Sequence, residues 1–325
     1  MKEEHWICPT PEKLPDFIIG GAMKSGTTTL HHILDAHPGI SIPKKELGFF
    51  DMDSIYQHTN FFIYDKKPKT WHPPFIENDP GLYWEWYTSQ FNKCKNKLIG
   101  EDSTTYLASK RAAKRISIQK KAIKLIFVLR HPTHRSFSNY NHLVKTGRAL
   151  YSFEDTLKIN PFSILNRSLY TAQLEYYYEH FPAENIKIIL FEDLISNKTE
   201  TIKDICSFLN IDFSEIDVSS LEKHSNKTLV PKNLKLKLLF NRRLLKYRSD
   251  KAVNNLPKRK GISKKVSSLT ELCYLRLEKL INPLGEKKPK KIKPETKLFL
   301  DNFFERELYG LDELTGVDIM NRWFS

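Results

Sequence analysis

The sequence predicts an α/β fold, a single domain in which helices flank a central parallel sheet. Two observations support this prediction. Short apolar runs of the length of buried strands alternate along the chain with longer segments whose apolar residues recur at helical spacing. One of these runs, residues 17–19, leads through a glycine-rich turn into a helical pattern. Strands that alternate with helices in this way pair in parallel, and helices cover both faces of the sheet.

Apolar character marks the expected strands. The run at 122–129 gives the strongest signal, and it stops at Arg130. A shorter run, 98–100, ends at Glu101. In chain order, the predicted strands are residues 17–19, 39–42, 98–100, 122–129 and 186–191.

Helical spacing and helix-ending residues mark the expected helices. The first opens with three threonines and carries Leu30, Ile33 and Leu34 on one face. Pro132 stands where the first turn of the second helix begins, and Gly147 stands where that helix ends. In chain order, the predicted helices are residues 27–34, 132–147, 168–180 and 199–209.

Three regions depart from this alternation, and they set the expected domain organisation. Residues 51–97 read as an aromatic-rich insertion, whose rings either line a substrate cleft or pack the insertion onto the core. Residues 227–290 read as a basic helical or lid region. Residues 1–13 are expected to form an N-terminal tail, so the domain is predicted over 14–325.

Composition excludes several classes of protein. A hydrophobic content of 40% favours a globular chain over a disordered one. No run of about eighteen apolar residues occurs, which argues against a transmembrane helix. The four cysteines are far apart and form no zinc pattern, so reduced thiols and a cytoplasmic location are expected: Cys8, Cys94, Cys206 and Cys273.

The positive charge is concentrated in one stretch. Residues 221–297 contain 23 Lys/Arg and 6 Asp/Glu, a balance of +17 in a chain of net charge +14, so the rest of the chain is slightly negative. Such a stretch suits an anionic ligand, an acidic polymer or a membrane surface, or else forms a solvated helical face. Within it, residues 234–248 have the pattern of a basic amphipathic helix. This helix fits a lid or surface helix, or a peripheral membrane contact.

The turn after the first strand has the composition of an anion-binding loop. Free backbone N–H groups and the positive end of the following helix attract an anion, and glycine lets it approach closely. The order Lys-Ser-Gly-Thr differs from the Gly-Lys-Ser/Thr of nucleotide triphosphatases, so these residues alone do not name the anion. The candidate binding residues are Lys24, Ser25, Gly26, Thr27, Thr28 and Thr29.

A second anion site is predicted at the end of the strongest strand. Arg130 ends that strand, and Ser138 follows eight residues later, in the second turn of a helix that starts near Pro132. An arginine fork fits phosphate oxygens, and a serine hydroxyl adds a donor. The pair suits a second phosphate, separate from the first; the alternative for Arg130 is an ion pair at the sheet edge.

A candidate general base lies between the two anion sites. Glu46 follows the second predicted strand and stands beside aromatic and apolar residues, which would raise the pKa of its carboxyl group. A carboxylate near an acceptor hydroxyl can act as a general base. On the residues alone, a surface glutamate beside two lysines is the competing interpretation.

Together these segments resemble the sulfotransferase superfamily that uses 3′-phosphoadenosine 5′-phosphosulfate (PAPS). Residues 17–34 and 124–140 are similar to its 5′-phosphosulfate loop and its 3′-phosphate segment. Residues 45–51 are similar to the Lys-Glu-x-x-Phe-Phe-Asp segment of heparan sulfate-type members. Residues 100–107 resemble the family's Gly-Glu-Lys-Thr-Pro-Ser-Tyr segment, and 298–323 resemble its closing helix and tryptophan. The resemblance implies a P-loop-like architecture, shared with nucleotide kinases.

The resemblance also implies roles for the candidate residues. Glu46 corresponds to the catalytic base, and Lys24 would stabilise charge on the bridging oxygen of the leaving phosphate. The loop would hold the 5′ end of PAPS, while Arg130 and Ser138 would hold the 3′-phosphate. The product is adenosine 3′,5′-bisphosphate, and no metal is required.

A basic loop of the relatives suggests two further cofactor-binding residues. By analogy with that loop, Lys227 and Lys232 would close over the 3′-phosphate. Both lie in the basic stretch.

Three positions depart from the animal heparan sulfate enzymes. Gly48 stands where the 3-O-sulfotransferases carry a histidine, Asp102 replaces a lysine, and Thr105 replaces part of a Pro-Ser pair. These positions are expected on the acceptor side, so they bear on the acceptor and not on the donor.

The expected enzyme is a bacterial, cytoplasmic sulfotransferase that acts on a hydroxyl or amine of a carbohydrate or glycoconjugate. A small alcohol or amine metabolite is the alternative acceptor. A nucleotide kinase and a non-catalytic protein that binds an acidic glycan or a membrane surface are the alternative functions. No nucleic acid partner is expected, and the oligomeric state stays open.

Overall fold

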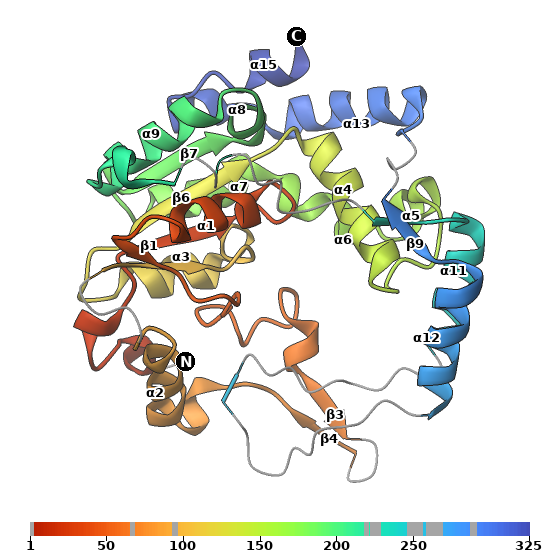
Figure 1. Ribbon diagram of the computed structural model, residues 1–325, viewed down its shortest axis with the longest axis horizontal. Coiled ribbons are helices and arrows are strands. Elements are labelled where there is room, and N and C mark those ends of the chain that lie inside the picture. Colours follow the sequence, from red (N-terminus) through yellow and green to blue (C-terminus); the bar gives the residue numbers. More distant parts are fainter. Residues whose placement is uncertain are drawn as a thin grey trace.

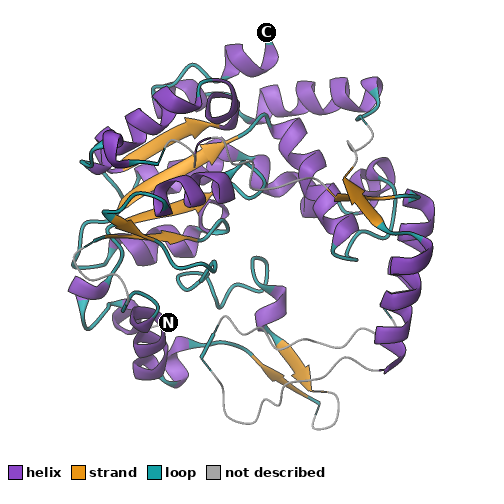
Figure 2. Ribbon diagram, in the orientation of Figure 1, coloured by secondary structure: helices purple, strands orange, loops and turns teal. Residues whose placement is uncertain are grey.

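A computed structural model describes residues 3–65, 69–92, 97–217, 221, 229–245, 256–257, 269–286 and 291–325. Its centre is a five-stranded sheet of order β2-β5-β1-β6-β7 (Figures 1 and 2). Every neighbouring pair of these strands is parallel, so the predicted α/β class is confirmed. The strands are β1 (Phe17–Gly21), β2 (Ile40–Ser41), β5 (Leu98–Asp102), β6 (Lys124–Leu129) and β7 (Ile186–Leu190).

The sheet is buried on both faces because its central strands are apolar throughout. Alternate residues of β6 point to opposite faces, so Leu125 and Phe127 join one core cluster while Ile126 and Val128 join the other. One face packs against α1 (Thr27–Asp35) and α9 (Lys198–Leu209), and the other against α3 (Lys110–Ser117), α4 (Pro132–Lys145) and α7 (Tyr170–Tyr178). This two-sided cover is the arrangement that the alternation of strands and helices predicts.

The other α-helices in the described residues surround this centre. In chain order, they are α2 (Pro80–Ser89), α5 (Phe153–Ile159), α6 (Phe162–Leu165), α8 (Phe191–Ser196), α11 (Leu234–Leu244), α12 (Leu269–Ile281), α13 (Pro294–Glu307), α14 (Leu311–Thr315) and α15 (Met320–Phe324). Residues 298–323, which resemble the closing helix and tryptophan of the family, are divided among the last three. The break comes at Gly310 and Gly316, both with positive φ.

The aromatic-rich insertion packs helix α2 onto the core, and its residues 55–61 line a cavity. Its helix α2 buries Tyr83, Trp84 and Tyr87 in the core, where the Tyr87 ring stacks on Phe49 with a centroid separation of 4.2 Å. The antiparallel pair β3 (Ile63–Asp65) and β4 (Thr70–His72) lies away from the sheet and leaves Trp71 exposed. Most of the aromatic side chains on α2 therefore stabilise the fold.

The N-terminal segment is part of the core, which corrects the expected tail at residues 1–13. Trp6 and Cys8 are each only 2% exposed. The Arg115 guanidinium lies over the Trp6 ring, 3.5 Å from its centroid, and Phe49 meets the ring edge-on. These contacts are tertiary, so the polar and proline-rich composition of the segment gave no sign of them.

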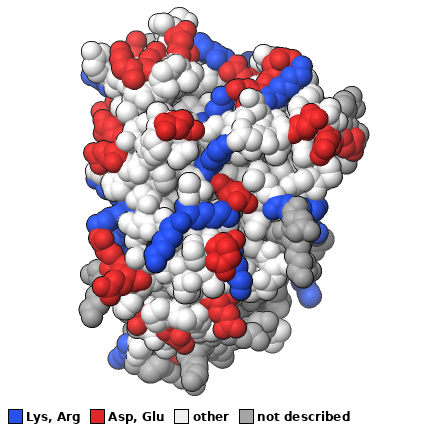
Figure 3. Space-filling model, turned by 90° about the vertical axis from the view of Figure 1, so that its left-hand side faces the viewer, with Lys and Arg blue, Asp and Glu red and all other residues white. Residues whose placement is uncertain are grey.

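The described part of the basic stretch forms the pair α11 and α12 and the short strands β8 (Leu229–Pro231) and β9 (Leu284–Glu286). Both helices lie beyond α4–α6, at the right-hand edge of Figure 1. Lys237 on α11 is buried and pairs with Glu278 of α12 at 2.5 Å, so part of the positive charge joins the two helices. On the opposite side of the molecule, Figure 3 shows both signs of charge interspersed. Among the described helices, none is long and apolar enough to cross a bilayer.

Candidate active site

The predicted anion loop joins β1 to α1 in the expected way. Gly26 is the N-cap of α1 and has a φ of 90°. Because glycine has no side chain, it cannot cap the first amides of the helix, those of Thr27 and Thr28. A Cβ at Gly26 would lie 2.7 Å from Cδ2 of Phe191, so only glycine fits there. Lys24 also has a positive φ, 74°. The loop thus presents open backbone donors and one lysine, which fits an anion.

The second predicted anchor lies beside this loop. Arg130 follows β6, the strand next to β1, and its Nη1 donates to the backbone oxygen of Lys24 at 3.1 Å. The guanidinium also lies over the Phe191 ring, 4.5 Å from the centroid, on the same residue that packs against Gly26. Burial lowers the pKa of Arg130. The two anion anchors, separated by more than a hundred residues in the chain, therefore form one site.

Helix α4 carries Ser138 along the same edge. Ser138 is partly exposed and lies one turn from both His134 and His142, so the three share a face of the helix. Burial lowers the pKa of His134 to about 4, with smaller contributions from His131 and from Arg130. Burial likewise lowers the pKa of His142 to about 4, and the charge of Lys24 contributes next. The charges of Arg130 and Lys24 therefore both act on this face of α4.

Lys24 has several positively charged neighbours. Burial lowers its pKa, the charges of Lys145 and Arg130 lower it further, and Glu46 opposes them.

Glu46 faces the loop from the segment after β2. Its Oε2 accepts a hydrogen bond from Thr104 Oγ1 at 2.8 Å. The residue is exposed and lines the cavity described next, and partial burial of its carboxyl group raises the pKa of that group. The charge of Asp102 raises that pKa further, whereas Thr104 and Arg167 lower it. A carboxyl with a raised pKa next to an open cavity has the properties of a general base.

A cavity of about 660 Å³ opens beside Glu46. Its walls come from the segment around Glu46, from residues 55–61 of the insertion, from the turn after β5 and from residues 139–167. Gly48 and Thr105 line it, in agreement with their expected place on the acceptor side. Asp102 does not line it, because its Oδ2 turns to His31 Nδ1, 3.3 Å away.

Sequence reasoning missed several residues of this cavity. Arg167 donates from Nη2 to Gln57 Oε1 at 2.8 Å, and its charge interacts with both Asp51 and Glu46. Arg148 and His58 also line the wall. Arg167 lies in a short 3₁₀ turn and Arg148 in an irregular segment, and no motif surrounds either residue, so no local signal marked them. Their side chains reach the cavity only through tertiary packing.

The structure describes one of the two basic-loop candidates, Lys232. Lys227 lies outside the described residues. Lys232 is exposed, and its backbone N–H donates to Pro283 O at 3.2 Å. It follows β8, which packs against α4, the helix of Ser138. A role for either lysine at the 3′-phosphate stays a prediction.

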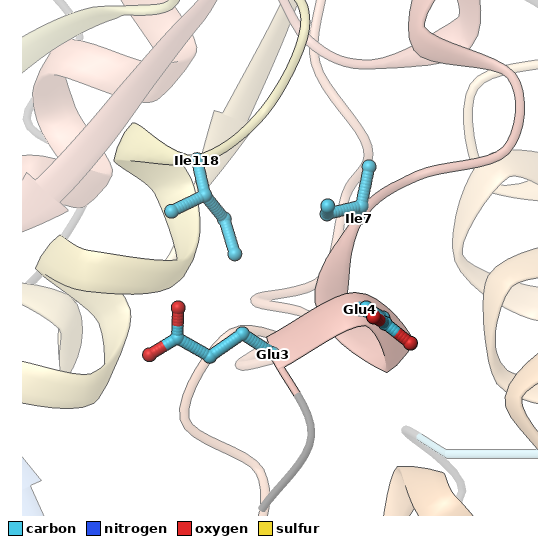
Figure 4. Close-up of a pocket in the computed structure, with 4 residues that line it drawn as sticks. All are labelled: Glu3, Glu4, Ile7 and Ile118. Atoms are coloured by element: carbon cyan, nitrogen blue, oxygen red, sulfur yellow. The ribbon is translucent and has the colours of Figure 1, made fainter.

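A separate hollow lies away from this chemistry. Glu3, Glu4, Ile7 and Ile118 line it (Figure 4). Ile118 precedes β6, so the hollow lies near the amino ends of the strands, opposite the anion loop. Glu3 is paired with Lys114 at the surface. In the described chain, no group of three or more His, Cys, Asp or Glu side chains could hold a metal ion.

A sequence model of the sulfotransferase family matches residues 15–215. The chain belongs to the sulfotransferase family. The matched range contains the anion loop, Glu46, Arg130 and Ser138. The assignment made from these motifs, to the sulfotransferases that use PAPS, is therefore confirmed at the level of the family.

Two curated relatives and one solved structure are similar to this sulfotransferase. Heparan sulfate glucosamine 3-O-sulfotransferase 5 of Mus musculus is 26% identical over 222 residues, covering 65% of this chain and 57% of the relative. Membrane-associated sulfotransferase kil1 of Dictyostelium discoideum is 25% identical, covering 65% of this chain and 60% of the relative. The chain thus spans less than two thirds of either relative. The sulfotransferase from Alicyclobacillus acidocaldarius superposes with a TM-score of 0.59 at 22% identity, covering 96% of this chain and 99% of that one, which confirms the fold.

A buried carboxyl network fixes the segment that carries Glu46. Glu101 on β5 accepts hydrogen bonds from Ser103 Oγ at 2.7 Å, from Tyr106 OH at 2.7 Å and from Tyr87 OH. Two of these hydroxyls also receive backbone N–H groups that follow Glu46 in the chain, those of Gly48 at 3.0 Å and Phe50 at 3.2 Å. Burial raises the pKa of Glu101 to about 7.

Glu101→Gln is expected to flatten the dependence of stability on pH. Because the folded-state pKa is raised above the ordinary 4.5, the wild type holds its full stability below pH 4.5 and loses some of it as the pH rises through 7. The loss is on the order of 3 kcal/mol. Urea unfolding at pH 5 and pH 8 measures it. The free energy of unfolding of the variant, minus that of the wild type, should be more positive at pH 8 than at pH 5. An equal difference at both pH values would contradict the assignment.

Proposed function

We propose that this sulfotransferase transfers the sulfuryl group from PAPS to a hydroxyl or amine of a carbohydrate or glycoconjugate. The observation that carries the proposal is the bond between Arg130 Nη1 and the backbone oxygen of Lys24, at 3.1 Å. It joins two anion anchors into one site, beside a cavity that Glu46 lines. A nucleotide with phosphates at both its 3′ and 5′ ends matches such a pair of anchors.

The residues of the site fit this donor. Open amides at the start of α1 and the glycine at its N-cap suit the 5′-phosphosulfate. Arg130 and Ser138 suit the 3′-phosphate, because an arginine fork and a hydroxyl both donate to phosphate oxygens. The donor supplies an activated sulfuryl group. Besides a base that takes the proton of the acceptor, the reaction depends on positioning and on fixed positive charge.

In this mechanism Glu46 accepts the proton of the acceptor hydroxyl while the acceptor oxygen bonds to sulfur. The bond between sulfur and the bridging oxygen of the 5′-phosphate breaks. Lys24 stabilises the charge that develops on that oxygen. The products are a sulfate ester and adenosine 3′,5′-bisphosphate. With an amine acceptor, the same steps give a sulfamate.

A carbohydrate acceptor is supported by the similarity to a heparan sulfate glucosamine 3-O-sulfotransferase and by the hydrogen-bonding side chains among those that line the cavity. A panel assayed with labelled PAPS tests this proposal. The panel contains an oligosaccharide of alternating glucosamine and glucuronic acid, a neutral N-acetylglucosamine oligosaccharide, a simple alkyl alcohol and an alkyl amine. Label is expected on a saccharide. Label on the alcohol or amine alone would overturn the carbohydrate proposal, and no transfer at all would overturn the activity. A cytoplasmic location and a membrane contact through residues 234–248 stay predictions.

Arg130→Lys is expected to weaken binding of adenosine 3′,5′-bisphosphate by roughly 10- to 100-fold, because lysine cannot reproduce the two-pronged contact of arginine with a phosphate. Isothermal titration measures the Kd. The affinity for adenosine 5′-phosphate, which lacks the 3′-phosphate, should change far less. Equal losses for both nucleotides would mean that Arg130 acts through its bond to Lys24 instead.

A further inference from the structure

Gly48 and His58 occupy one space in the wall of the acceptor cavity. Gly48 has a φ of 58°, and a Cβ built on it would lie 2.6 Å from Cε1 and 2.9 Å from Nε2 of His58. Side chains do not approach that closely, so position 48 must be glycine while the imidazole stands there. The ring of His58, which belongs to the insertion, therefore occupies the space that a side chain at position 48 would fill.

Three contacts fix the orientation of this ring. His58 Nε2 lies 2.6 Å from Oδ1 of Asp51 and 3.3 Å from Oγ1 of Thr105. The ring stacks on Phe61 with a centroid separation of 4.5 Å and an interplanar angle of 4°. Asp51 is fully buried and its carboxylate can only accept, so in the neutral ring Nε2 carries the hydrogen and donates it in a hydrogen bond to Asp51. The basic atom of that ring is then Nδ1.

The free nitrogen belongs to a residue that lines the cavity. Among the described residues, no hydrogen bond to Nδ1 is recorded. The charged side chains that line the same cavity are Glu46, from the segment after β2, and Arg148 and Arg167, from the segments after α4 and α6. Asp51, also after β2, contacts the ring directly. If the His58 ring only filled space, its Nε2 would not need a hydrogen bond to the buried carboxylate of Asp51.

We propose that His58 is an acceptor-binding residue, whose Nδ1 accepts a hydrogen bond from a second hydroxyl of the acceptor. Asp51 is the positioning residue that fixes the tautomer and the plane of the ring. Glu46 takes the proton from the reacting hydroxyl, and His58 binds a neighbouring one, so the pair selects which hydroxyl of a polyol reaches the sulfuryl group. This inference rests on the proposed function and deepens it, because it names acceptors with at least two hydroxyls as the preferred class.

Steady-state kinetics with labelled PAPS test the proposal, with the saccharide from the panel that gives the highest turnover. His58→Gln keeps an amide on Asp51 and has no group at the Nδ1 position. It is expected to raise the KM for the acceptor roughly 10-fold or more while the Kd for adenosine 3′,5′-bisphosphate changes less than about twofold. His58→Phe, which keeps the ring on Phe61, should raise the acceptor KM in the same way.

Two further measurements separate recognition from packing. In the wild type, one monodeoxy analogue of the saccharide should bind about 10-fold less tightly than the parent, and in His58→Gln this difference should vanish. The single variant Gly48→His should lower acceptor affinity, because its new side chain would collide with His58. The double variant Gly48→His/His58→Ala should recover that affinity. The double variant Gly48→Ala/His58→Ala, which returns a Cβ without an imidazole, should not recover it.

The outcomes distinguish this inference from the proposed function. If the wild type sulfates no saccharide, the proposed function and this inference both fail. If the wild type sulfates the saccharide and His58→Gln keeps its acceptor KM within about twofold, only the role of His58 is overturned. A deoxy penalty that persists unchanged in His58→Gln would also overturn it, since the hydroxyl then binds elsewhere.

Discussion

Glu46→Gln is expected to lower kcat by about 10²- to 10⁴-fold, the usual contribution of a general base. The amide keeps the size of the side chain and can still accept the hydrogen bond from Thr104 Oγ1, which is 2.8 Å in the wild type. It cannot take a proton from the acceptor. Single-turnover transfer from labelled PAPS measures the loss of rate.

Binding of adenosine 3′,5′-bisphosphate provides the control for this variant. Because Glu46 lies on the acceptor side of the loop, its replacement should leave that Kd within about threefold of wild type. Turnover that survives in Glu46→Gln would show that another group takes the proton. A loss of nucleotide binding in parallel with turnover would point to damage of the fold.

The pH profile tests the same carboxylate through its neighbours. The base must be deprotonated, so activity is lost as the pH falls through the raised pKa of Glu46, at a pH above the ordinary glutamate value of 4.5. Asp102→Asn removes a charge that raises this pKa, so the acid limb should move to lower pH. Thr104→Ala removes a hydrogen bond that lowers it, so the limb should move to higher pH. Shifts in the same direction would contradict Glu46 as the titrating group.

Local patterns in the sequence were sufficient to predict the framework of the donor site. The apolar run of β6, the glycine turn after β1 and the threonines that open α1 are each determined by residues next to them in the chain. Parallel pairing then places the ends of β1 and β6 together, which is why Arg130 and Lys24 could be expected at one edge.

The acceptor side could not be predicted to the same extent, because its residues meet only through tertiary packing. His58 reaches Gly48 by way of an irregular segment, and no periodicity marks it. Arg167 lies in a short 3₁₀ turn (Asn166–Ser168) and contacts Gln57, more than a hundred residues earlier. The burial of Trp6 was missed for the same reason, because its partner Arg115 lies on α3, more than a hundred residues later in the chain.

Lys24→Met is expected to lower kcat by about 10²- to 10³-fold, comparable to removing one donor that stabilises a developing oxyanion. Methionine keeps most of the length of the side chain and removes its charge. Because the charge matters most when the bridging oxygen becomes negative, kcat should fall more than the affinity for adenosine 3′,5′-bisphosphate. Lys44→Met, at an exposed lysine, is the control and should stay near wild type. A variant that loses only nucleotide affinity would limit Lys24 to binding.

The opposed charges of Lys24 and Glu46 also set the range of pH in which the enzyme works. Lys24 must be protonated, and burial and its cationic neighbours lower its pKa from 10.5, while the pKa of Glu46 is raised from 4.5. Activity is therefore lost on the alkaline side as the pH rises through the lowered pKa of Lys24, and both limbs of the profile lie inside the ordinary values. Lys145→Met removes the second largest cause of the lysine shift, so the alkaline limb should move to higher pH while the acid limb stays in place. An alkaline limb that remains in Lys24→Met would belong to a different group.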